Sequence, residues 1–211
     1  CFGTAFGAFV SYSKSAFHTK FLVTLDPSFD FKTLVILLGI INGITYAGGA
    51  FFGARLADKW GKKDIRAYGW LPAISISLCL PIGITAWWAS SVEINLIFTS
   101  LFLLFYGTYL GPCFAIAQTL APIHMRAMST ALFFFFINMI GLGLGPTTSG
   151  WLIDFFGTNS TNIDSMRFAM TLITCVLIPS IISFLIVAYK LPKDWDIAEK
   201  NNLKLAKMDS S

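Results

Sequence analysis

The residues of this chain that could do chemistry are polar side chains set within long apolar runs. Six of them stand out: Asn42, Tyr46, Tyr106, Tyr109, Asn138 and Thr148. Asn42 and Tyr46 are four positions apart and Tyr106 and Tyr109 are three apart, so each pair shares one face of a helix. A polar group at bilayer depth is costly unless it meets water or bonds to a neighbour. These residues therefore either line a cavity or join helices by hydrogen bonds, and both interpretations remain open.

The apolar runs themselves indicate what holds these residues. Of the 211 residues, 55% are hydrophobic and 12% are charged, whereas a soluble domain carries roughly twice that charged fraction. Six runs can be counted, at residues 1–17, 33–54, 68–89, 94–117, 129–155 and 168–189. Each complete run holds the ~20 residues that a helix needs to cross a bilayer. Backbone groups in lipid must be satisfied within the segment, and alternating polarity typical of membrane strands is absent. The sequence predicts an all-α polytopic membrane protein, with six transmembrane helices in a bundle at residues 1–190.

The basic residues predict how the bundle is oriented. Five lie between the second and third runs, Arg126 lies between the fourth and fifth, and five more follow the sixth. Because loops rich in Lys and Arg stay in the cytoplasm, we expect a cytoplasmic C-terminus in the cell membrane (inner or plasma). Residues 191–211 mix both signs of charge. We expect them to form a solvated, mobile cytoplasmic tail, although a short surface helix with Trp195 near the headgroups is the alternative.

The stretch GGAFFGARLADKWGKK at residues 48–63 combines small residues with a dense basic cluster. Gly49 and Gly53 lie on one helical face and permit close approach of a neighbouring helix. The carboxylate of Asp58 can satisfy free amides at the N-terminus of another helix, and Gly61 permits a tight turn. Three lysines would hold this loop at the anionic inner leaflet: Lys59, Lys62 and Lys63.

A second stretch of small residues, GLGLGPTTSG, occupies residues 141–150 in the fifth run. Its glycines thin the helix, and its proline removes one backbone hydrogen bond. We expect a pliable and closely packed helix crossing, formed by Gly141, Gly145, Pro146 and Gly150.

Both stretches resemble motifs of the major facilitator superfamily. The first is similar to the signature loop G-x-L-A-D-R-x-G-R-R, although Ala54 stands where a glycine is usual and lysines replace arginines, which weakens bidentate pairing. The second is similar to G-x-x-x-G-P-x-x-G-G of the fifth helix, with Ser149 in place of a glycine. Within the superfamily the chain looks most like the spinster-like branch, in LPAI at 71–74, LGPCFAIAQ at 110–118, and MRA at 125–127 followed by INMIGLGLGP. The resemblance covers residues 39–189.

This resemblance implies the C-terminal bundle of a twelve-helix secondary transporter. The chain opens at Cys1, part-way into an apolar run, and we expect a missing N-terminal half of six helices. The implied function is transport of a small amphipathic or lipid-like solute by rocker-switch alternating access. The implied partners are that solute, the lipid bilayer and the missing half, with no nucleic acid. Asp58 and Arg126 would then act in gating, and the six polar residues named first would line the cavity.

Other functions remain open or are disfavoured. The chain could work as a homodimer of half-transporters or as a non-transporting sensor with a transporter fold. An intramembrane serine protease would need a histidine at membrane depth, and none is expected, so we predict no enzyme activity and no catalytic residues. The four cysteines have no paired spacing, and we expect no metal site and no cofactor.

Charged residues within the runs are few. No Asp or Glu lies deep in any of the six, so a proton carrier would belong to the missing half or be a histidine. His18 and His124 are both expected in loops. Lys14 could meet an anionic group in the cavity, but we expect it to reach the outer interface from a helix end.

Overall fold

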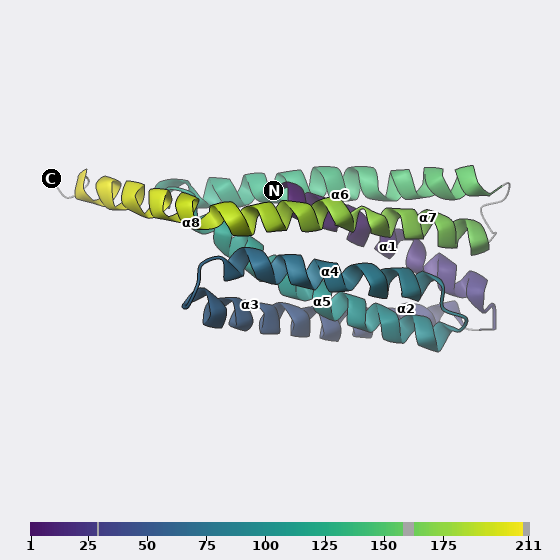
Figure 1. Ribbon diagram of the computed structural model, residues 1–211. Coiled ribbons are helices and arrows are strands. Elements are labelled where there is room, and N and C mark those ends of the chain that lie inside the picture. Colours follow the sequence, from purple (N-terminus) through teal and green to yellow (C-terminus); the bar gives the residue numbers. More distant parts are fainter. Residues whose placement is uncertain (29, 158–162, 209–211) are drawn as a thin grey trace.

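The computed structural model describes residues 1–28, 30–157 and 163–208. These residues form long helices that lie side by side, and no strand occurs among them (Figure 1). The α-helices are α1 Phe2–Leu25, α2 Phe31–Ile41, α3 Ala47–Gly61, α4 Ala67–Trp87, α5 Val92–Thr119, α6 Arg126–Phe156, α7 Ile163–Cys175 and α8 Leu177–Met208. Asn42–Tyr46 forms a π-turn between α2 and α3, and Ile123–Met125 forms a 3₁₀ turn before α6.

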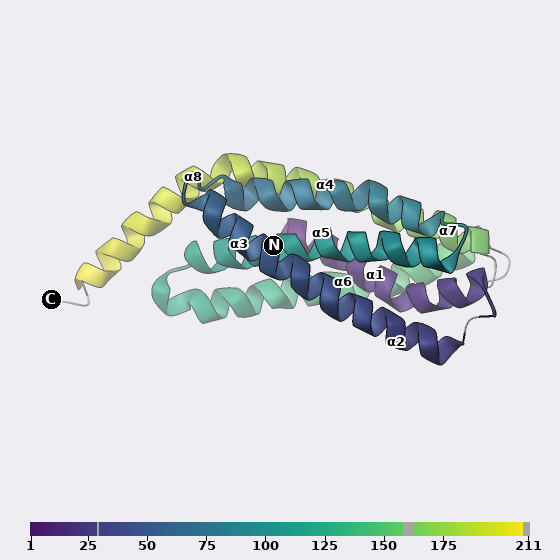
Figure 2. The same ribbon diagram turned by 90° about the horizontal axis from the view of Figure 1, so that it is seen from below.

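The predicted all-α membrane fold is confirmed. Five stretches are long and apolar enough to cross a membrane: Phe31–Gly61, Ala67–Trp87, Val92–Thr119, Arg126–Phe156 and Ile163–Lys200. The 24 residues of α1 also have that length, about 36 Å at 1.5 Å per residue. In the bundle, α1 packs against α6 and α8, while α5 packs against α3 and α4. Contact between α4 and α8 joins these two groups of helices (Figure 2).

The first helix continues beyond residue 17, where the apolar run was expected to stop. Phe21 and Leu22 lie on this extension and are completely buried. The helix ends before Pro27, because a residue that precedes proline favours an extended backbone, and Asp26 is extended. Hydrogen bonds from the hydroxyl and amide of Ser28 lower the pKa of the Asp26 carboxyl. Because α1 runs from Phe2 to Leu25, His18 lies within a helix and not in a loop, which corrects the expectation from sequence.

The sixth apolar run is divided into two helices at Val176. Pro179 has no amide hydrogen to donate to the carbonyl of Cys175, and its ring crowds that carbonyl, so the break falls there. The second helix, α8, then continues to Met208 and does not end at residue 189. The expected solvated tail is thus helical as far as Met208, while residues 209–211 lie outside the described part. Lys and Leu are frequent in this segment and favour helix.

One end of the bundle holds the α3–α4 connection, the α5–α6 connection and the C-terminal part of α8 (Figures 1 and 2). We call it the basic end, because Lys59, Lys62, Lys63 and Arg126 are at or near these connections. In Figure 2 the yellow end of α8 turns away from the other helices, and Pro192 lies within this helix. A proline inside a helix is a common cause of such a bend.

The crossing of α3 and α5 brings two backbones into direct contact. A Cβ atom at Gly53 would lie 2.5 Å from the Cα of Thr108. Gly49 meets the backbone of Leu104 in the same way, and Gly107 of α5 meets the backbone of Tyr46 and Ala50. Only glycine permits an approach this close, so these residues fix the separation of the two helices.

Replacing Gly53 with Leu should therefore destabilise the bundle, by about 1–3 kcal/mol or more, because the new side chain overlaps backbone that cannot move aside. The matched control is Gly48→Leu on the same helix, where a Cβ meets nothing within 4 Å. Melting of the detergent-purified protein measures both. Equal melting temperatures for the two variants would contradict the close crossing.

Candidate functional site

A polar cavity of about 340 Å³ lies between α1, the α2–α3 segment and α5. Its polar and aromatic lining includes Lys14, His18, Asn42, Tyr46, Thr99 and Phe102. Val35, Leu38 and Leu103 add apolar wall. A concave site with a few polar groups among apolar walls is typical of small-molecule binding. Asn42 and Tyr46 are the two residues that the sequence proposed as cavity-lining and that the structure places here.

The π-turn at Asn42–Tyr46 shapes one wall of this cavity. The side-chain amide of Asn42 donates to the carbonyl of Leu38 at 2.8 Å, and the hydroxyl of Thr45 donates to the carbonyl of Ile41. These bonds satisfy carbonyls where the regular α-helical pattern is interrupted. A π-turn rotates the residues that follow it, so Gly49 packs against α5 and does not share a wall with Asn42. The simple helical spacing of the sequence did not predict this rotation.

Lys14 is the cation of the cavity and is buried, with 7% of its surface exposed. Its Nζ has no hydrogen-bond partner. The Nζ lies 4.1 Å from the ring centre of Phe102 and 5.8 Å from that of Trp87. The expectation that Lys14 reaches the outer interface is therefore wrong, because α1 extends past Leu22 and keeps Lys14 in its middle.

The burial of the Lys14 ammonium group is energetically unfavourable. Burying an ammonium group costs several kcal/mol, whereas a desolvated cation–π contact contributes about 2 kcal/mol. The contacts with Phe102 and Trp87 thus offset only part of the cost. An anion in the cavity would offset the remainder.

His18 lies one turn beyond Lys14 and is 5% exposed. The side-chain amide of Asn95 donates to the carbonyl of Ala86 at 2.6 Å, which directs its Oδ1 to the Nε2 of His18 at 2.7 Å. Nε2 consequently carries the proton and donates, leaving Nδ1 as an acceptor. The hydroxyl of Thr99 lies 3.4 Å from the same Nε2. The sequence analysis missed this group, and the apolar FLVTL that follows Lys20 was the signal that could have placed His18 in a helix.

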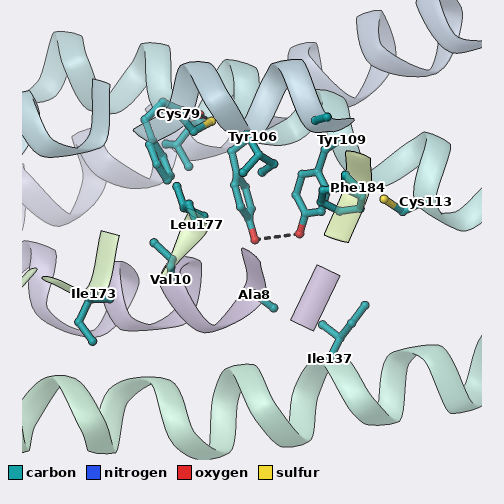
Figure 3. Close-up of a cluster of buried hydrophobic side chains, with 14 of the residues drawn as sticks. Ala8, Val10, Cys79, Tyr106, Tyr109, Cys113, Ile137, Ile173, Leu177 and Phe184 are labelled. Carbon is teal, nitrogen blue, oxygen red and sulfur yellow. Dashed lines mark hydrogen bonds between the residues drawn. The ribbon is translucent and has the colours of Figure 1, made fainter. Parts of the chain in front are cut away.

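Tyr106 and Tyr109, which the sequence proposed as cavity-lining, lie beside the polar cavity in the hydrophobic core. They are 4% and 2% exposed, and their hydroxyl oxygens are 3.0 Å apart (Figure 3). The ring of Tyr106 stacks on Phe102, with centres 5.6 Å apart, and lies 6.3 Å from the ring of Tyr46. Tyr106 therefore supports two aromatic walls of the cavity from behind.

Asn138 and Thr148 lie on α6 and do not line this cavity themselves, although Asn138 bonds to Tyr12, which does. The Oδ1 of Asn138 accepts from the hydroxyl of Tyr12 at 2.9 Å, and its side-chain amide donates to the carbonyl of Phe134. Asn138 is exposed and borders a shallow apolar depression on α6. Thr148 is half-buried. In this bundle Asn138 joins α6 to α1.

The small-residue stretch of α6 faces α1. A Cβ at Gly145 would lie 2.8 Å from the carbonyl oxygen of Phe9, and one at Gly141 would lie 2.9 Å from the Cβ of Ala8. Gly150 lies near Phe17, and Pro146 is accommodated within α6 between Gly145 and Gly150. This contact fixes α1, and with it Lys14, in the bundle.

We call residues 48–63, which resemble the signature loop, the signature-like stretch. It covers most of α3 and part of the turn after it. Gly49 and Gly53 are buried against α5, as described above. Asp58 is exposed near the end of α3, and its Oδ1 accepts from the hydroxyl of Tyr68 at 3.4 Å. Four basic residues that the sequence assigned to the inner-leaflet loop or to gating are exposed at the basic end: Lys59, Lys62, Lys63 and Arg126. Gly61 packs against the ring of Tyr68. His124 is exposed in the 3₁₀ turn before α6.

A larger cavity of about 650 Å³ opens at the basic end, among α1, α5, α6 and α8. Most of its lining is apolar, and its charged residues are Lys190 and Asp194. It offers volume but few directional contacts. Of these two cavities, the smaller one has more polar groups that could orient a ligand.

Comparison with known proteins places this fold. No protein-family model matches the sequence, and no curated protein matches it. The chain is similar to two crystal structures of a bacterial homologue of the human lysosomal transporter Spinster. The inward-facing, unoccupied structure gives a TM-score of 0.82 and the inward-facing, occupied one 0.81, both at 20% sequence identity. The match covers 92% of this chain and 47% or 49% of the bacterial chain, so this chain spans about half the length of those proteins. The fold that the sequence resemblance implied is thus confirmed, since this chain has the fold of about half of that transporter.

The ammonium group of Lys14 has no hydrogen-bond partner, so its removal should change the stability of the protein. Lys14→Met keeps the length of the side chain and removes the buried charge, so it should raise the free energy of unfolding by about 1–4 kcal/mol. Lys20→Met, on the exposed side of α1, should leave it unchanged. Melting temperatures of the ligand-free proteins in detergent provide the measurement. A marked fall for Lys14→Met alone would mean that Lys14 is already paired within the protein.

Proposed function

We propose that this chain, a multi-pass membrane protein with the fold of about half of a major facilitator transporter, is the C-terminal six-helix bundle of a secondary transporter. The solute is a small amphipathic molecule whose acidic group binds in the polar cavity. Transport proceeds by rocking this bundle against an N-terminal half of six helices.

The observation that carries this proposal is the buried ammonium of Lys14 in a cavity with both polar and apolar walls. Polar groups of Lys14, His18 and Thr99 gather on one part of the lining. Val35, Leu38 and Leu103 suit a hydrocarbon portion. An acidic amphiphile supplies both the charge that Lys14 lacks and the apolar surface that these walls would bury.

The basic end provides the gate in this proposal. In this proposal the basic end and the C-terminus lie on the cytoplasmic side of the plasma or inner membrane, an orientation that the lysines favour. Asp58 caps a helix of the N-terminal half when that side is closed, since a carboxylate is stabilised by free amides and by the positive end of a helix dipole. Its exposure leaves the carboxylate accessible to such a partner.

Transport by the full-length protein in phosphatidylcholine vesicles tests this function. Two probes of equal chain length are compared, a lysophosphatidic acid and the uncharged monoacylglycerol. Lys14→Met should slow transport of the acid about 30-fold or more, because loss of one partner of a buried charge pair costs about 2–5 kcal/mol. Lys14→Arg should retain part of the activity.

The monoacylglycerol serves as the internal control, since its transport should not depend on Lys14. Lys20→Met controls for a change of charge on α1. If the wild-type protein carried both probes equally well and Lys14→Met carried them at the wild-type rate, the proposed solute site would be wrong.

A further inference from the structure

The carboxylate of Asp58 is held by a residue outside the signature-like stretch. Its Oδ1 accepts a hydrogen bond from the hydroxyl of Tyr68, at 3.4 Å, across the turn between α3 and α4. The turn itself is built by its own backbone, because the amides of Lys63 and Asp64 both donate to the carbonyl of Trp60. The turn therefore brings α4 back to α3 so that Tyr68 reaches Asp58.

Gly61 makes room for this tyrosine. A Cβ at Gly61 would overlap the ring of Tyr68, so the ring occupies the space that a side chain would otherwise fill. The sequence analysis assigned Gly61 to a tight turn. The structure adds that Gly61 seats the ring of the residue that binds Asp58.

The ring of Tyr68 also contacts α8. The ring of Trp195 stacks on it, with centres 5.9 Å apart and an angle of 22° between the planes. Next to Tyr68, Gly69 brings α4 into backbone contact with Ala188 of α8. This contact anchors α8 two helical turns before Trp195.

Trp195 is half-buried and continues the buried stripe of α8. Ala188 and Leu191 are each 1% exposed, and Trp195 follows them at the i, i+3, i+7 spacing of one helical face. The stripe thus continues past Pro192 into the segment that sequence predicted to be a solvated tail. This segment packs on the bundle as far as Trp195.

From these contacts we propose that Tyr68 and Trp195 are positioning residues for Asp58. Trp195 holds the ring of Tyr68, and Tyr68 holds the carboxylate at the basic end. The end of α8 thereby sets the geometry of the gate. This inference rests on the proposed role of Asp58 in closing the transporter.

The test uses the full-length protein and a set of single and double variants. Asp58→Asn is the reference and should lower the maximal rate of transport about tenfold. Trp195→Ala should lower it several-fold without changing KM, because the polar cavity is formed by other helices. Trp195→Phe keeps a stacking ring and should restore most of the rate, and Tyr68→Phe removes only the hydroxyl and should resemble Trp195→Ala.

The decisive comparison is the double variant. If Trp195 acts through Asp58, adding Trp195→Ala to Asp58→Asn should cause no further loss. Ile197→Ala removes an exposed apolar side chain from the same helix and should have no effect. A loss from Trp195→Ala that is equally large in the Asp58→Asn background, or no loss in either background, would overturn the positioning role.

Amide hydrogen exchange at residues 62–68 separates this inference from the proposed function. Exchange there should be faster in Trp195→Ala than in the wild type and near normal in Trp195→Phe, whether or not the protein transports the probe. Normal transport by Asp58→Asn would refute the gate while leaving this exchange result intact. Unchanged exchange in Trp195→Ala would refute the contact on which the positioning depends.

Discussion

Glycines let the helix backbones of this bundle touch, and these contacts set where the other side chains lie. Gly141 and Gly145 seat α1 against α6, and Gly53 seats α3 against α5. Without side chains at these points, the helices approach closely enough for dispersion contacts to hold them in an apolar solvent. One side of α1 is thereby committed to α6. Another side of α1, which carries Lys14, faces α5 and the polar cavity.

Some polar side chains around the cavity have hydrogen-bond partners, whereas the ammonium group of Lys14 has none. His18 bonds to Asn95, and Asn95 bonds in turn to the carbonyl of Ala86. Lys14, four residues from His18, has aromatic rings as its neighbours and no hydrogen bond. A satisfied network beside an unsatisfied charge is the arrangement expected where a ligand completes the site, because the protein alone leaves the charge uncompensated.

The sequence predicted the features that depend on composition and on spacing within one helix. Apolar runs predicted the membrane helices, and the glycines at 141 and 145 predicted a close crossing. Burial of Lys14 and His18 was not predicted, because polar residues at 18–20 interrupt the first run and only the packing of Phe21 and Leu22 shows that the helix continues. The π-turn shifts the helical register at Asn42–Tyr46, which spacing cannot reveal. The packing of the end of α8 on the bundle involves Trp195 meeting Tyr68, a residue distant in the chain.

The most direct measurement is a binding titration of the purified full-length protein with a lysophosphatidic acid and with the uncharged monoacylglycerol of the same chain length. The wild type and Lys14→Met are titrated in parallel. The wild type should bind the acid more tightly, and this preference should disappear in Lys14→Met while affinity for the uncharged lipid is retained. A preference for the acid that persists in Lys14→Met would show that another group binds the anion, and would contradict the central role given to the polar cavity.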